Sequence, residues 1–232
     1  MDAGAAVEGL YIAPDAVNSE SCTRLLDLAR AAGIRVHELQ SGVMERVADA
    51  VSPQPILGVV AALDVALDRV LNDQLLVVLV DVRDPGNVGA IIRSADAAGA
   101  GAVVCCAGSG DVYNPKAVRA SAGSIFNIPI VQAPGADETL HALGKAHVRR
   151  LATLMHGGTD YATSDLSGAV AIVLGNEAQG LDDALATQFD GALSIPIEGG
   201  AESLNVAMAA TVLCFDYARR KRAGSLGPTM TP

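Results

Sequence analysis

The chain has 232 residues, half of them hydrophobic and 3% aromatic, with a formal net charge of −10. This length suits one large domain or two small ones, and no apolar run approaches the ~20 residues of a membrane helix. The acidic balance argues against broad electrostatic binding of nucleic acid, because phosphate contacts depend on lysine and arginine. The N-terminal stretch MDAGAAVEGL lacks the basic start and apolar core of a signal peptide, which predicts a cytoplasmic location.

Residues 1–66 are predicted to form a small α/β domain. Turn and helix-capping signals separate short apolar segments, and Gly33 follows the first helical pattern as a typical C-terminal signal. The expected strands are 9–13, 34–39 and 56–61, and the expected helices are 21–32 and 43–50.

Residues 67–224 are predicted to alternate strands and helices around a parallel sheet. The expected strands are 75–82, 102–106, 128–132, 150–155, 169–174 and 192–195. The expected helices are 88–98, 115–122, 136–146, 180–187 and 203–222. Residues 225–232 are predicted to be a disordered tail.

Three loops rich in glycine and asparagine follow predicted strands, at residues 84–89, 175–180 and 195–205. In an open parallel sheet, loops beyond the carboxyl ends of the strands build the ligand site, so these three are expected to converge. In the first loop, DPGNVGAIIR, Asn87 is either a helix N-cap or a site residue. Arg93 is either an ordinary exposed helix residue or a site residue.

The second and third loops carry further polar candidates. In IVLGNEAQGL, Gly175 would let a ligand approach the backbone closely. Glu177 either caps the next helix or accepts hydrogen bonds from a ligand or from Arg93. In IPIEGGAESLNVAMAA, Ser203 is either the N-cap of the last long helix or a site residue. The basic run at its end, 219–222, suits the negative end of the helix dipole.

The four cysteines are expected to be buried free thiols. Cys105 and Cys106 are adjacent in a predicted strand and do not form a CxxC pair. Because no histidine is placed to complete a zinc site, no metal is predicted.

Together, in this order and spacing, the three loops resemble those of the SpoU (TrmH) family of RNA ribose methyltransferases, within the SPOUT class. The resemblance covers residues 75–222 and rests on DPGNVGAIIRSADAAGA, VLGNEAQGL and IPIEGGAESLNVAMAA. It implies a trefoil-knotted α/β domain with a parallel sheet, acting as a homodimer. Residues 9–62 resemble the family's small N-terminal RNA-binding domain, without its usual opening helix and first strand.

The resemblance also implies the ligands and the residues that meet them. The cofactor would be S-adenosylmethionine, and the substrate an RNA, ribosomal in preference to transfer RNA. The implied cofactor-binding residues are Leu174, Gly175, Ile195, Ile197 and Leu204. The implied catalytic residues are Asn87, Arg93, Glu177, Ser203 and Asn205.

The resemblance assigns the key role in the reaction to Arg93, often as general base. A guanidinium with a pKa above ~12 is better suited to hold the substrate phosphate and orient the 2′-hydroxyl. We expect Asn87 and Arg93 of one subunit to meet Ser203 and Asn205 at a site near the dimer interface. Asn87 would shape the pocket and orient Arg93, and Glu177 would hold Arg93 in place. Ser203 and Asn205 would position ribose or cofactor.

Two other functions compete with this one. A Rossmann-type oxidoreductase would need GxGxxG after a strand and an acid about twenty residues later, and neither is present in proper form. A non-catalytic RNA-binding or ribosome assembly factor on the same fold agrees with the acidic charge. The retained polar residues of the three loops oppose it.

Overall fold

The computed structural model describes residues 5–14, 20–48, 53–72 and 75–227. The chain divides into two compact units, Met1–Leu63 and Asp64–Pro232. None of the described helices combines the length and apolar character needed to cross a membrane.

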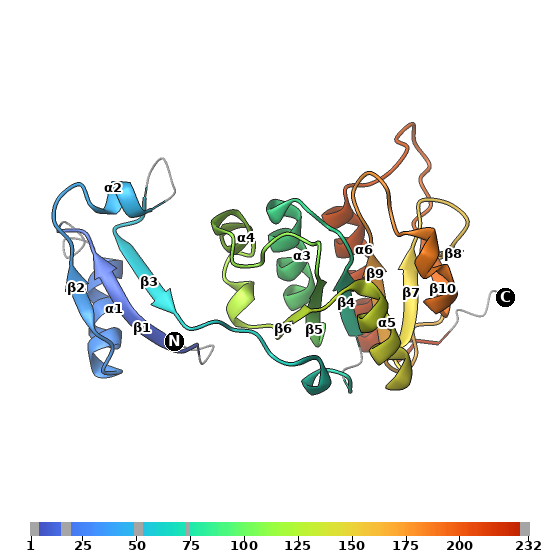
Figure 1. The fold of residues 1–232 in the computed structure, drawn as a ribbon, viewed down its shortest axis with the longest axis horizontal. Helices are drawn as coiled ribbons and strands as arrows, with labels where there is room; N and C mark the ends of the chain where they lie inside the picture. Colours follow the sequence, from blue (N-terminus) through green and yellow to red (C-terminus); the bar gives the residue numbers. More distant parts are fainter. Residues whose placement is uncertain (1–4, 15–19, 49–52, 73–74, 228–232) are drawn as a thin grey trace. The chain divides into compact units, whose positions relative to one another are not determined.

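The smaller unit is a three-stranded sheet with one long helix (Figure 1). Strand β1 is central, parallel to β2 and antiparallel to β3. Ile12 and Leu26 form the core between the sheet and α1, so the helix covers one face of the sheet. The elements are β1 (Val7–Ile12), α1 (Glu20–Ala31), β2 (Val36–Glu38), α2 (Met44–Val47) and β3 (Ile56–Val60).

The larger unit is built on a seven-stranded sheet of order β6-β5-β4-β9-β7-β10-β8, in which every pairing is parallel. The predicted α/β class with a parallel sheet is therefore confirmed, while the trefoil knot stays a prediction. The elements are η2 (Leu67–Arg69), β4 (Leu75–Leu79), α3 (Pro85–Ala98), β5 (Ala102–Cys106), α4 (Pro115–Ala120), η3 (Ser124–Phe126), β6 (Ile130–Ala133), α5 (Ala136–Lys145), β7 (Arg149–Thr153), β8 (Thr159–Asp160), β9 (Val170–Leu174), η4 (Asp183–Gln188), β10 (Gly191–Ser194) and α6 (Val206–Ala223).

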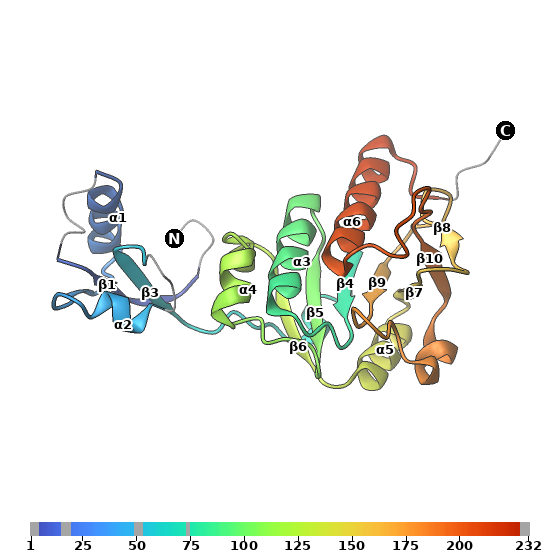
Figure 2. The ribbon, with the colours of Figure 1, turned by 90° about the horizontal axis from the view of Figure 1, so that it is seen from above.

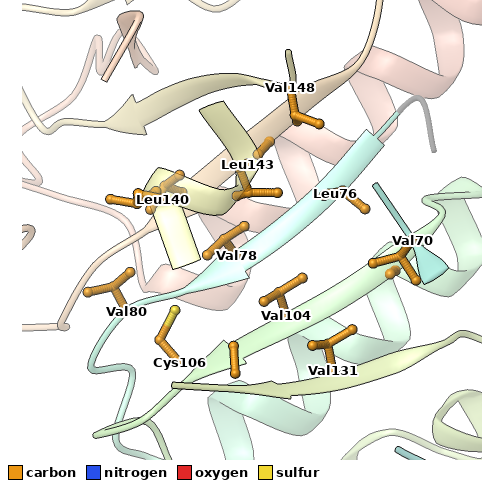
Figure 3. Close-up of a cluster of buried hydrophobic side chains, with 14 of the residues drawn as sticks. Val70, Leu76, Val78, Val80, Val104, Cys106, Val131, Leu140, Leu143 and Val148 are labelled. Carbon is orange, nitrogen blue, oxygen red and sulfur yellow. The ribbon is translucent and has the colours of Figure 1, made fainter. Parts of the chain in front are cut away.

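Helices cover both faces of this sheet. Figure 2 shows α4, α3 and α6 along one face, with α5 on the other. Strands β4, β5 and β9 are buried along their whole length, as expected for parallel strands between two helical layers. Side chains alternate between the layers: Val78 packs with Leu143 of α5 (Figure 3), whereas Leu75 packs with Leu213 of α6.

The structure corrects two of the predicted helices. The segment expected to be a helix at 180–187 is the 3-10 helix η4, and Asp182 caps it by accepting a hydrogen bond from the Ala184 N–H. The last helix begins at Val206 instead of Ser203, because the Asn205 side chain caps it. Ser203 is therefore not the cap.

Two features near the end of the described residues add to the sequence analysis. Arg220, one of the basic run at the end of α6, is only 1% exposed and forms an ion pair with Asp216. Of the tail predicted to be disordered, Leu226 packs against the core, and its carbonyl accepts a hydrogen bond from the Leu166 N–H. The rest of that tail, 228–232, lies outside the described residues.

Candidate functional site

A cavity of about 400 Å³ lies where β7, β9 and β10 end. This volume falls within the range of small-molecule sites in proteins. The second and third glycine-rich loops converge on it, together with the start of α6. All five residues expected to bind a cofactor line the cavity: Leu174, Gly175, Ile195, Ile197 and Leu204.

A fourth loop, which we did not predict, completes the wall of the cavity. Thr153, the last residue of β7, and residues 154–156, which follow the strand, line the space. Met155 is 60% exposed and adds apolar surface to this wall. The sequence signal for this loop is the pair Gly157-Gly158, a few residues after the end of a strand. A Cβ on Gly158 would lie 2.6 Å from the Leu193 carbonyl carbon of β10, so the loop must pack closely there.

The fold itself requires glycine at position 175, apart from any ligand. A Cβ at this position would lie 2.5 Å from the backbone carbon of Gly180, because a pair of backbone hydrogen bonds joins Asn176 and Gly180. The Asn176 side chain accepts hydrogen bonds from two following N–H groups and donates one to the Asp81 carbonyl. Asn176 is thus a loop-forming residue that sequence reasoning missed.

Asn87, Glu177 and Asn205 form one hydrogen-bonded network that joins the three predicted loops. The Asn87 Nδ2 donates to Glu177 Oε1 at 2.9 Å, and the Asn205 Nδ2 donates to Asn87 Oδ1 at 3.0 Å. Glu177 also accepts the N–H groups of Arg83 and Asp84, each at 3.3 Å. The network holds the start of α3 against the rim of the cavity, since Glu177 also lines it.

Helix α3, which follows the first loop, is capped by Asp84 and not by Asn87. Asp84 precedes α3, and its carboxylate accepts the Asn87 N–H at 2.9 Å. Its other oxygen binds the Lys116 ammonium at 2.6 Å. The Lys116 hydrogen bond, followed by the Asn87 N–H, holds the pKa of Asp84 below its usual value. Because the cap leaves the Asn87 side chain free of helix capping, its amide can bridge Glu177 and Asn205.

Glu177 is held as a carboxylate. Its partial burial acts to raise the pKa, but the Asn87 amide and three backbone N–H groups outweigh this, so the pKa lies below its ordinary value. A carboxylate of this kind is a weak proton acceptor at neutral pH. Its negative charge at the cavity rim instead favours a cationic ligand.

Arg93 lies on the exposed side of α3. Within one chain and among the described residues, its side chain makes no hydrogen bond or ion pair, so the expected contact with Glu177 is not formed there. The Glu177 oxygens are taken by Asn87 and the backbone. Six residues of an α-helix also separate Asn87 from Arg93, which places them on different helix faces. Asn87 therefore does not orient Arg93 directly.

Ser203 lines the cavity, two residues before the cap Asn205. The structure thus brings four of the five predicted catalytic residues to the cavity or the network beside it. Arg93 stands apart on α3.

Comparison with known proteins shows that the chain matches one protein family. The model of the family described as "SpoU rRNA Methylase family" matches residues 74–215. The chain is 37% identical over 186 residues to the 23S rRNA (uridine(2479)-2'-O)-methyltransferase of Streptomyces viridochromogenes, which covers 77% of this chain and 64% of that protein. It is 38% identical over 186 residues to the 23S rRNA (guanosine(2553)-2'-O)-methyltransferase RlmP of Bacillus subtilis, covering 79% of this chain and 72% of that protein.

A solved structure agrees with these relatives. The AdoMet-bound rRNA methyltransferase from Sinorhizobium meliloti has a TM-score of 0.81 and 33% identity, covering 95% of this chain and 82% of that one. The family match lies entirely within the larger unit, which holds the cavity and the network.

Proposed function

The chain belongs to the SpoU rRNA Methylase family, and we propose that it transfers a methyl group from S-adenosylmethionine to a ribose 2′-hydroxyl of ribosomal RNA. The observation that carries the proposal is a cavity of cofactor size joined, through Glu177, to a network of the three motif loops. Two relatives named as 23S rRNA 2′-O-methyltransferases and one structure with bound AdoMet support the choice of donor and acceptor.

The residues of the cavity fit this cofactor. Adenine needs an apolar slot and backbone hydrogen bonds more than it needs charges. Leu174, Ile195 and Leu204 supply apolar surface, and the backbone around Gly175 is close at hand. The ionised Glu177 at the rim suits the positive charge of a sulfonium. When bound, S-adenosylmethionine supplies the methyl group on an excellent leaving group.

The side chains of the chain then have separate tasks. Arg93 stands apart from the cavity within one chain, so we place its role at the interface of the homodimer proposed below. There it holds the RNA phosphate and turns the 2′-hydroxyl toward the methyl group, since its side chain is exposed and outside any ion pair in the described residues. Asn87, Glu177 and Asn205 fix the start of α3. Ser203 positions ribose or cofactor at the cavity. Arg93 itself stays protonated, since a guanidinium has a pKa above ~12.

We propose a homodimer that works on ribosomal RNA in the cytoplasm and needs no metal for this displacement. Met208 and Phe215 support the dimer, because they are 62% and 44% exposed and lie seven residues apart on one face of α6. We also propose that residues 1–66 contribute RNA binding and that residues 67–224 carry the chemistry.

The test is tritiated methyl transfer to ribosomal RNA with Arg93→Ala, Arg93→Lys and wild type. We expect Arg93→Ala to lower kcat about a hundredfold or more, as for loss of a transition-state contact. Binding of S-adenosylmethionine, measured by calorimetry, is expected to stay unchanged. Arg93→Lys keeps the charge but loses the two-pronged geometry, so it should recover part of the rate.

A matched control is Lys145→Ala, which removes a cation from the last turn of α5, on the other face of the sheet. It is expected to leave the rate unchanged. Retained turnover in Arg93→Ala would remove Arg93 from the mechanism. Cofactor binding without methyl transfer to any ribosomal RNA would favour the non-catalytic assembly factor.

A further inference from the structure

The sheet of the smaller unit has one face that α1 does not cover. Leu10 and Ile12 of β1 are buried, and Ile12 packs against Leu26 of the helix. Tyr11 lies between them in sequence, so it points to the opposite face. There its ring stacks on that of His37, with the ring centroids 5.1 Å apart and the planes at 21°.

This ring pair runs across the sheet and ends at its edge. Tyr11 and His37 are directly paired residues of β1 and β2, and β2 is the outer strand of the order β2-β1-β3. The Tyr11 ring occupies one side of the imidazole. Among the described residues no strand lies beyond β2, and His37 is exposed. One face of the imidazole is therefore open to a further planar group.

The surroundings of the pair suit a nucleotide. Gly9 lies beneath the rings and places no side chain beside them: a Cβ there would lie 3.8 Å from the Tyr11 ring and 3.9 Å from His37. Arg35 is exposed two residues before His37 and shares its face by strand alternation. Glu38, the acid of β2, lies on the other face. A flat π-surface beside a guanidinium matches the base and phosphate of one nucleotide.

We propose that Tyr11 and His37 form a stacking platform that binds an unpaired base of the RNA substrate, with Arg35 contacting the adjoining phosphate. This inference rests on the proposed function, because it assigns a binding site to the same RNA. Stacking on aromatic side chains tolerates any base, because every base has a π-face. On a chain of net charge −10, it adds RNA affinity to the contacts that its cations make with phosphate.

The absence of tryptophan from the chain permits a direct test. In the full-length His37→Trp variant the only tryptophan stands in the platform, so a stacked base quenches its fluorescence. We expect saturable quenching by a short oligoadenylate, weaker quenching by oligouridylate, and none by duplex RNA, whose bases are already paired. The matched control is Leu28→Trp on α1, where the replaced side chain is 52% exposed. Its emission is expected to stay constant.

Affinity measurements separate the two contacts. His37→Ala should weaken oligoadenylate binding about five- to hundredfold, the range for one stacked base, with the same salt dependence as wild type. Arg35→Ala should instead reduce the slope of log affinity against log salt by about one. Equal quenching in both tryptophan variants, quenching by duplex RNA, or unchanged affinity in His37→Ala would each overturn the platform.

The same variants distinguish this inference from the function on which it rests. If oligoadenylate quenches the tryptophan fluorescence of His37→Trp but the wild-type chain transfers no methyl group to ribosomal RNA, the platform stands and the proposed function is removed. Methyl transfer at the wild-type rate by His37→Ala on limiting ribosomal RNA, together with absent quenching, would do the reverse.

Discussion

Replacing Arg220 with alanine is expected to destabilise the larger unit by about 3–5 kcal/mol, the cost of breaking a buried ion pair. Arg220 Nε lies 2.7 Å from Asp216 Oδ2, its Nη1 donates to the Ser164 carbonyl at 2.6 Å, and its Nη2 donates to the Tyr161 carbonyl. Each carbonyl left buried without a donor costs about 1–3 kcal/mol, so the two together account for most of this range. The loss of charge beside Asp216 adds the rest.

The neighbouring Arg219 is the matched control. It contacts the same Asp216, at 2.7 Å, but its side chain is 62% exposed. Exposed ion pairs contribute about 0–1 kcal/mol, so Arg219→Ala should change little. Urea unfolding followed by circular dichroism gives the free energies, and hydrogen exchange of the α6 amides confines the comparison to the larger unit. If Arg219→Ala cost as much as Arg220→Ala, burial would not be the source of the effect.

Three further predictions concern the cavity, acid stability and the thiols. Gly175→Ala, which has no room for a Cβ, should weaken calorimetric binding of S-adenosylmethionine at least tenfold, whereas Gly199→Ala, with open space around it, should not. The Arg150 hydrogen bond lowers the pKa of Asp190 in the folded protein. The pair therefore stabilises the fold fully above the ordinary carboxyl pKa of ~3.9, and this stabilisation is lost as the pH falls through the lower pKa of the folded state. In Asp190→Asn the free energy of unfolding should fall less steeply on the acid side. At about pH 8 a thiol reagent should label the native protein at Cys22 alone, because the other three thiols are buried. Burial raises the pKa of all three, to about 12 for Cys105 and Cys214. Fast labelling of more than one thiol would contradict this.

The parallel sheet was predictable because burial on both faces leaves a direct trace in the sequence. Leu75 to Leu79 is a continuous apolar run, and all five residues are buried. The start of α6 was not predictable from the sequence, because Ser203 and Asn205 are both good capping residues and the local sequence does not favour one over the other. The burial of Arg220 was also hidden, because the carbonyls that need its guanidinium come from a loop 56 and 59 residues away.

The candidate site shows the same division between local and distant causes. Strand–loop patterns and the family resemblance led to Gly175, Ile195 and Leu204, and these residues do line one cavity. The expected contact between Arg93 and Glu177 is not formed within one chain, because helix rotation carries Arg93 away from the face that meets the second loop, and it stays a prediction for the dimer. A pattern of residue types gives the members of a site, but the pairing among them depends on which helix face packs inward.

The net charge of −10 sets a condition on how RNA can be held. Near the start of α3 the cations Arg83 and Lys116 are already paired with Asp81 and Asp84. Arg93 is outside any ion pair in the described residues and remains available to meet phosphate. The salt dependence of the affinity reports how many phosphates such cations neutralise, since the slope follows that number. Contacts to bases must supply the remainder, and an exposed stacked ring pair is the kind of surface that makes them without charge.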